Sequence, residues 1–102
     1  MYVPKACRDG TRRGAGCKLH LSLHGCDVNR YYEEQVQHLG FENWAEANEM
    51  VVLFPRMAEY GTTTQTKWGC WDGYGQTGAD YALKSGAQMV AVREMIRAVA
   101  GV

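Results

Sequence analysis

The sequence has very few serines and no excess of charge of either sign. Ser22 and Ser85 are the only serines among 102 residues, and neither lies in a G-x-S-x-G turn, the pattern that presents the nucleophile of many serine hydrolases. The 11 basic and 11 acidic side chains give a net charge of zero, so the basic surface typical of nucleic-acid-binding proteins is not expected. The composition therefore argues against nucleic-acid binding and against a serine nucleophile in this chain.

Long hydrophobic runs are also missing. The longest apolar stretch, Met50–Phe54, is far shorter than the roughly 20 residues that cross a bilayer. Met1–Pro4 does not begin a basic segment followed by an apolar one, as a secretory signal would. We therefore expect a soluble chain with no membrane contact and no signal peptide.

The chain does contain four cysteines, an even number in a short sequence that also has 12 glycines. This combination suggests disulfides and an oxidising compartment. Disulfides would help a chain of this size, which buries only about 65% of its unfolded surface. The missing signal peptide leaves two interpretations open: Met1 is not the natural start, or the thiols serve chemistry or metal binding in the cytosol.

Three segments have the patterns of extended chain. Lys18–His24 alternates polar and apolar residues with a period of two, which indicates a strand. Met50–Phe54 is a continuous apolar run closed by Pro55, which is typical of a strand buried on both faces. Tyr2–Pro4 resembles the end of a further strand.

Two helical regions follow these strands. Asp27 or Asn29 can cap the first region, and Gly40 is expected to break it into two pieces. Asp80 can cap a last helix that ends at Gly101. The expected apolar faces consist of Tyr32, Val36, Leu39 and Trp44 in the first region, and of Met89, Val92, Ile96 and Val99 in the last. The order strand, helix, strand, helix predicts one α/β domain over residues 1–102, a βαβα unit with a short parallel sheet.

Residues 56–79 have neither a helical nor a strand period and are expected to form a long loop, a feature that is usually functional or mobile. Trp68, Trp71 and Tyr74 lie in it, close to Cys70 and among several glycines. Aromatic side chains on such a loop can form an apolar platform for a substrate. Packing of the tryptophans over the edge of the sheet is an equally good interpretation.

Four residues with zinc-binding side chains lie within ten positions: Cys17, His20, His24 and Cys26. On a strand, however, odd and even positions point to opposite faces, and residues 17 and 24 would be about 23 Å apart. No two cysteines have the C-x-x-C spacing of thioredoxin-like redox proteins. A metal or redox site is therefore the weakest interpretation.

Two disulfides are the stronger interpretation of the cysteines. Cys7 and Cys17 bracket a polar, glycine-rich loop over residues 8–16, whereas Cys26 and Cys70 both lie beyond the carboxyl ends of adjacent predicted strands. These places favour the pairs Cys7–Cys17 and Cys26–Cys70, each contributing about 2–4 kcal/mol to stability. Free buried thiols remain the alternative.

The stretch Leu21–Cys26 ends the first predicted strand in a turn formed by His24 and Gly25. In α/β-hydrolases the strand before the first large helix ends in such a turn, and a backbone N–H just after it helps to hold the oxyanion of the tetrahedral intermediate. Gly25 lets the chain bend so that this N–H faces the open site. His24 is a conceivable general base, but without a serine partner we expect it to stabilise the turn.

Taken together, these motifs resemble the poly(3-hydroxybutyrate) depolymerase-type esterases over nearly the whole chain. The matching segments, in order, are Tyr2–Cys7, Cys17–His20, Leu23–Cys26, Gly40–Asn48, Val51–Pro55 and Gly69–Asp72. The likeness is to the carboxyl-terminal third of a circularly permuted α/β-hydrolase, with a three-layer fold. The sequence departs from the family pattern at Gly73, where an aromatic residue is usual.

The resemblance implies a Ser-His-Asp triad, which would lie upstream of Met1, and no cofactor or metal. It also implies that Cys26 donates its N–H to the oxyanion hole, that the cysteines are paired, and that Trp68, Trp71 and Tyr74 contact substrate. Members of this esterase family are secreted or periplasmic, so the resemblance implies the same location for the parent protein. We therefore expect a fragment of an ester hydrolase for poly(3-hydroxyalkanoates) or related short-chain esters, inactive alone. The alternative is a small disulfide-stapled binding or scaffold domain, which could self-associate through an exposed sheet edge.

Overall fold

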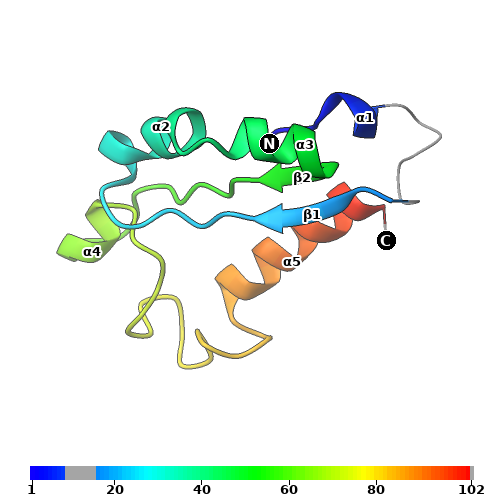
Figure 1. Cartoon of the computed structure of the whole chain (residues 1–102). Coiled ribbons are helices and arrows are strands. Elements are labelled where there is room, and N and C mark those ends of the chain that lie inside the picture. The colour runs from blue at the N-terminus through cyan, green and yellow to red at the C-terminus, as the bar shows by residue number, and fades with distance from the viewer. Residues whose placement is uncertain (9–15, 102) are drawn as a thin grey trace. The chain divides into compact units, whose positions relative to one another are not determined.

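The computed structural model describes residues 1–8 and 16–101, so most of the glycine-rich loop expected at 8–16 lies outside the described residues. The elements in chain order are α1 (Lys5–Arg8), β1 (Lys18–Leu21), α2 (Val28–His38), α3 (Phe41–Asn48), β2 (Met50–Leu53), α4 (Thr64–Lys67) and α5 (Ala87–Ala100) (Figure 1). They form two compact units. The first unit comprises Met1–His24 and Arg30–Arg56, and the second comprises Gly25–Asn29 and Met57–Val102.

The first unit contains a two-stranded parallel sheet, as the sequence predicts. β1 pairs with β2 in a register that sets Leu19 beside Val51. The pairing continues past the strand ends, because Ser22 donates its N–H to the Leu53 carbonyl at 2.9 Å. Tyr2 adds a single antiparallel bridge to Val52, so the expected amino-terminal strand is reduced to this one pair.

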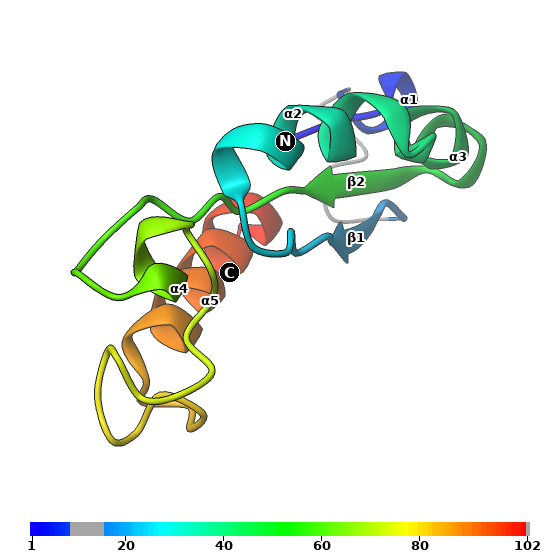
Figure 2. The same ribbon diagram turned by 90° about the vertical axis from the view of Figure 1, so that its left-hand side faces the viewer.

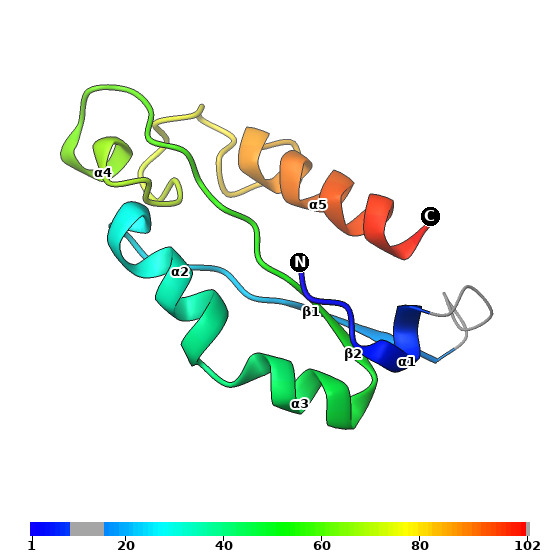
Figure 3. The same cartoon turned by 90° about the horizontal axis from the view of Figure 1, so that it is seen from above.

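Two helices cover one face of this sheet. Figure 2 shows α3 and the greater part of α2 along the same face of β1 and β2, and Figure 3 shows them as two separate rods. They are separated at Gly40, whose φ of 74° is a left-handed conformation that glycine adopts without strain. The predicted break is therefore confirmed. α2 begins at Val28, directly after Asp27, so Asn29 lies inside this helix and does not cap it.

The core of the first unit lies between the sheet and these helices. Ala45 and Val52 are completely buried, and Phe54 is nearly so. Tyr32 packs against this cluster and donates its hydroxyl to the Phe54 carbonyl at 2.7 Å. Burial raises the pKa of Tyr32 above its ordinary value. Leu39 and Trp44, expected on the same face as Tyr32, are 62% and 48% exposed, so that part of the predicted apolar face is wrong.

The second unit contains a short helix where the sequence predicts an uninterrupted loop. Thr63 caps α4 by accepting a hydrogen bond from the Thr66 N–H at 3.2 Å, which satisfies one of the free N–H groups at the helix start. Thr66 is 2% exposed, and its own hydroxyl donates to the Thr63 carbonyl at 3.0 Å. A run of threonines with no apolar periodicity thus forms a helix through local capping.

The last helix begins six residues later than a cap at Asp80 predicts, because its N-cap residue is Gly86. Asp80 does not cap it, because hydrogen bonds from Leu83 to Asp80 and from Gly86 to Leu83 turn the intervening chain, and α5 begins at Ala87. The end at Gly101 is confirmed. Of the predicted stripe, Val92, Ile96 and Val99 are half-buried, whereas Met89 is 49% exposed. No helix in the described ranges 1–8 and 16–101 has the length and apolar character needed to span a membrane.

Candidate functional site

The structure joins Cys7 to Cys17 and Cys26 to Cys70, the pairing that the sequence favours. The Cα atoms are 6.0 Å apart in the first disulfide and 4.3 Å apart in the second. All four thiols are therefore consumed, and Cys17 and Cys26 are not available as thiolate ligands. The first disulfide belongs to the first unit and the second to the second unit.

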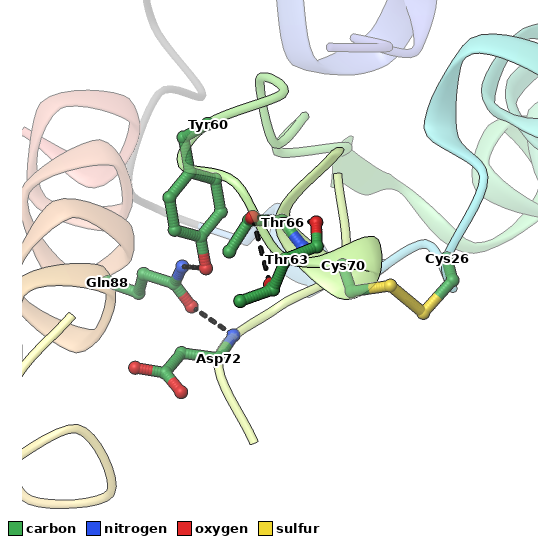
Figure 4. The surroundings of a disulfide bond; sticks show 7 residues. All are labelled: Cys26, Tyr60, Thr63, Thr66, Cys70, Asp72 and Gln88. Carbon is green, nitrogen blue, oxygen red and sulfur yellow. Dashed lines mark hydrogen bonds between the residues drawn. A yellow bond between two sulfur atoms is a disulfide. The ribbon is translucent and has the colours of Figure 1, made fainter. Parts of the chain in front are cut away.

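The turn that carries Cys26 is held in the second unit at three adjacent points. The disulfide ties Cys26 to Cys70, which is 5% exposed (Figure 4). Val28 donates its N–H to the Trp68 carbonyl at 3.1 Å. Gly69 has a φ of 66°, and a Cβ built on it would lie 2.4 Å from Val28 Cγ1, so only glycine allows this close approach.

The turn itself is open to solvent. Gly25 and Cys26 are exposed, and Asp27 has a φ of 60°, which marks a sharp change in chain direction before α2. The hydrogen bonds found among the described residues include none donated by the Cys26 N–H. The Cys26 N–H therefore lies on an exposed turn that a disulfide anchors.

The three histidines have different environments. His24 is 5% exposed and packs edge-on against the Tyr32 ring, with 5.8 Å between ring centres. His20 lies beside Phe41 at 5.3 Å and Trp44 at 6.1 Å, in a shallow hollow of the first unit. His38 is exposed in the last turn of α2.

The aromatic residues of the long loop divide into exposed and half-buried ones. Tyr74 is 78% exposed and Trp68 is 55% exposed, whereas Trp71 is half-buried. Trp68 and Tyr74 therefore leave more than half of their surface open to solvent. Trp71 follows Cys70 directly, which places it next to the disulfide of the Cys26 turn.

Asp72 organises the backbone that follows Trp71. Its Oδ1 accepts hydrogen bonds from the N–H groups of Tyr74, Gly75 and Gln76 at 2.9, 2.7 and 3.1 Å. Its Oδ2 accepts from the Thr77 N–H at 2.7 Å and from the Thr77 hydroxyl at 2.6 Å. Desolvation raises the pKa of Asp72, but these hydrogen bonds together outweigh it and hold the pKa well below its usual range. Asp72 is therefore an ionised structural residue of the loop.

Gln88 links this loop to α5. Its Oε1 accepts the N–H of Asp72 at 2.8 Å, and its Nε2 lies 3.5 Å from the Tyr60 hydroxyl (Figure 4). Sequence reasoning did not select Asp72 or Gln88 as site residues. An aspartate ahead of a glycine-rich run is a known turn signal and could have identified Asp72, but no local pattern identifies Gln88.

Comparison with known proteins confirms the relationship suggested by the motifs. The chain is 39% identical over 97 residues to a poly(3-hydroxybutyrate) depolymerase from Delftia acidovorans, a match that covers 93% of this chain and 18% of that protein. It is 29% identical over 109 residues to a polyhydroxybutyrate depolymerase from Talaromyces funiculosus, with 97% of this chain and 31% of that protein covered. The chain thus spans less than a third of the length of either relative. No family model and no solved structure matches it.

Proposed function

We propose that this chain forms the oxyanion-hole and substrate-crevice part of an ester hydrolase that acts on poly(3-hydroxyalkanoates) or related short-chain esters. In this proposal the fold is part of an α/β-hydrolase, and the nucleophile comes from polypeptide outside these residues. The observation that carries it is the similarity to two depolymerases across at least 93% of the chain, which includes the Cys26 turn and the Trp71 loop.

Cys26 would take part through its backbone and not through its sulfur. Its N–H lies on an exposed turn that the disulfide to Cys70 anchors, and such a donor needs no reorganisation when negative charge develops on the substrate carbonyl. Gly25 would let the chain approach the substrate closely, and His24, which is buried, would stabilise the main chain that leads into the turn.

The aromatic loop would form one wall of the crevice. A short-chain polyester presents methyl groups and ester carbonyls, so apolar rings suit the former and single N–H donors suit the latter. Trp71 is next to the anchored disulfide, and Tyr74 and Trp68 expose large apolar surfaces. We assign substrate contact to these three side chains.

The serines support a nucleophile from elsewhere. Ser22 is 8% exposed and its Oγ accepts a hydrogen bond from Gln35 Nε2 at 3.1 Å, so a substrate cannot reach it. Ser85 is exposed in the turn before α5, without the strand-to-helix elbow that activates a nucleophilic serine. The disulfides fit a secreted or periplasmic parent protein, because such compartments are oxidising.

A chimaera tests this proposal. The segment of the Delftia acidovorans depolymerase that matches this chain is replaced by the chain, and hydrolysis of poly(3-hydroxybutyrate) film and of a soluble butyrate ester is measured. We expect the chimaera to hydrolyse both and the isolated chain to hydrolyse neither. A folded chimaera without activity, or an active isolated chain, would contradict the proposal.

The oxyanion role is tested within the active chimaera by a matched pair of variants. Cys26→Ser with Cys70→Ser removes the disulfide but keeps the N–H, whereas Cys26→Pro with Cys70→Ser removes both. Loss of one oxyanion donor lowers kcat about 100- to 1000-fold. We expect that difference between the two variants, and equal rates would exclude Cys26 as a donor.

A second candidate is a disulfide-stapled binding or scaffold domain, and one observation favours it. In the described part of the chain, the sheet has only two strands, so β1 has one hydrogen-bonded neighbour and its other edge is unpaired. Unpaired strand edges promote association with other chains. Concentration-dependent sedimentation of the chain, with no activity in the chimaera, would favour this candidate.

A further inference from the structure

Trp71 lies between two residues whose main chain is held in place. On its amino-terminal side, Cys70 is buried, disulfide-bonded, and donates its N–H to the Gln65 carbonyl at 3.0 Å. On its carboxyl side, Asp72 donates its N–H to Gln88 Oε1 at 2.8 Å. The indole of Trp71 therefore projects from a backbone that is fixed at both neighbouring residues.

The hydrogen bond to Gln88 acts directly on Trp71. The Asp72 N–H belongs to the same planar peptide as the Trp71 carbonyl, so holding the N–H also holds the carbonyl in the opposite direction and sets the ψ angle of Trp71. Figure 4 shows the Gln88 side chain reaching from α5 to the Asp72 nitrogen and to the Tyr60 hydroxyl. Gln88 is half-buried near the start of α5, so its amide comes from a regular element rather than from a loop.

The loop beyond this peptide is independently ordered. The Asp72 carboxylate accepts hydrogen bonds from the four N–H groups of residues 74–77, which keeps the main chain after Trp71 in one conformation. The hydrogen bond to Gln88 attaches this ordered loop to α5. Its removal would leave the hydrogen bonds of the Asp72 carboxylate intact but release the Trp71–Asp72 peptide from Gln88.

We propose that Gln88 is a positioning residue, which orients Trp71 for contact with the polyester by accepting the hydrogen bond of the Trp71–Asp72 peptide. The substrate contact rests on the proposed function, whereas the orientation of Trp71 does not. Gln88 itself does not touch the substrate. A pre-oriented indole lowers the entropy cost of binding, because the ring need not be immobilised when the ester arrives.

The test uses the full chain with Trp44→Phe and Trp68→Phe, so that Trp71 is the only tryptophan. Gln88→Met removes the acceptor and keeps a helix-forming side chain of similar length, whereas Gln88→Glu keeps the acceptor and suits the first turn of a helix. Tyr60→Phe is the matched control, because it removes only the other contact of Gln88. Far-ultraviolet circular dichroism verifies that each variant is folded.

The first readout is the near-ultraviolet circular dichroism of Trp71. We expect Gln88→Met to lose more than half of the tryptophan band, and Gln88→Glu and Tyr60→Phe to keep it. Retention of the band in Gln88→Met overturns the positioning role. Equal loss in Gln88→Met and Gln88→Glu also overturns it, because the acceptor would then not be the cause. Loss in Tyr60→Phe would assign the effect to Tyr60 instead.

The second readout is binding of a soluble trimer of (R)-3-hydroxybutyrate methyl ester, measured by isothermal titration calorimetry on chains that keep Trp44 and Trp68. We expect Gln88→Met to raise the Kd about two- to tenfold, the effect of having to immobilise one side chain on binding, and Gln88→Glu to leave it unchanged. Unchanged affinity in a Gln88→Met chain that has lost the band overturns the substrate part. If the parent chain binds no trimer, the substrate part of this inference is overturned, the chimaera assay still decides the proposed function, and the first readout still decides the role of Gln88.

Discussion

Removal of the two disulfides, one at a time, should destabilise different units by different amounts. Cross-linking reduces the entropy of the unfolded chain by an amount that grows with the logarithm of the closed loop. The sequence separation is 44 residues for Cys26–Cys70 and 10 residues for Cys7–Cys17. At 25 °C these separations correspond to about 4 kcal/mol and about 2.7 kcal/mol of stabilisation. Replacing each pair by serines should therefore cost more for Cys26–Cys70 by about 1.3 kcal/mol.

Urea unfolding followed by tryptophan fluorescence measures this difference in each unit. Trp44 lies in the first unit and Trp71 in the second, so chains in which one of these two is the only tryptophan, with Trp68 also replaced by phenylalanine, report on one unit. We expect the Cys26–Cys70 double serine variant to lower the free energy of unfolding seen by Trp71, and the Cys7–Cys17 variant to lower the one seen by Trp44. Addition of a reductant to the parent chain should reproduce both effects together.

Two results would refute this reasoning. If the Cys7–Cys17 variant were the less stable of the two, loop-closure entropy would not be the main contribution of the disulfides. If Trp71 reported no loss in the Cys26–Cys70 variant, the hydrogen bond from Val28 to Trp68 and the close packing of Gly69 would be sufficient to hold the turn without the covalent bond.

Three further predictions concern single side chains. Gly69→Ala should lower the free energy of unfolding by about 2–4 kcal/mol in a denaturant titration, because position 69 has a positive φ and the added Cβ would clash with Val28. In the control, Gly73→Ala, the added Cβ meets no atom within 4 Å, so the free energy of unfolding should change by less than about 0.5 kcal/mol. Tyr32→Phe should cost about 1–2 kcal/mol in the same assay, because it leaves the carbonyl of Phe54, a buried residue just after β2, without the Tyr32 donor; a loss below the error of the titration would contradict this. The lowered pKa of Asp72 predicts that its stabilisation is complete above its ordinary pKa of about 4 and is lost as the pH falls through the lower folded value. The parent and an Asp72→Asn chain should therefore differ in stability by a constant amount from about pH 5 to pH 8 and converge in more acidic solution, and a difference that grew on acidification would show that the sign is wrong.

Local patterns in the sequence determined the parts of the fold that depend on neighbouring residues. The apolar run at Met50–Phe54 and the alternation after Lys18 have strand periods, and a parallel pair follows because a helix connects them. Gly40 separates two helices because it adopts a left-handed conformation that other residues rarely adopt. The cysteine spacing and the depolymerase motifs likewise identified the disulfide pairs and the relatives without any structure.

Only the tertiary structure decided features that depend on contacts between distant residues. The start of α5 at Ala87 follows from a series of turns after Asp80, although aspartate is a good cap on local grounds. The exposure of Trp44 depends on which atoms of the unit surround it, and its position on a helix does not reveal this. Gln88 accepts a hydrogen bond from the Asp72 main chain, 16 residues away in the sequence, and no residue type or spacing predicts such a bond. Hydrophobic periodicity and turn chemistry determine local structure over a few residues, whereas the hydrogen-bond partner of a buried or half-buried amide depends on which distant residues the fold brings beside it.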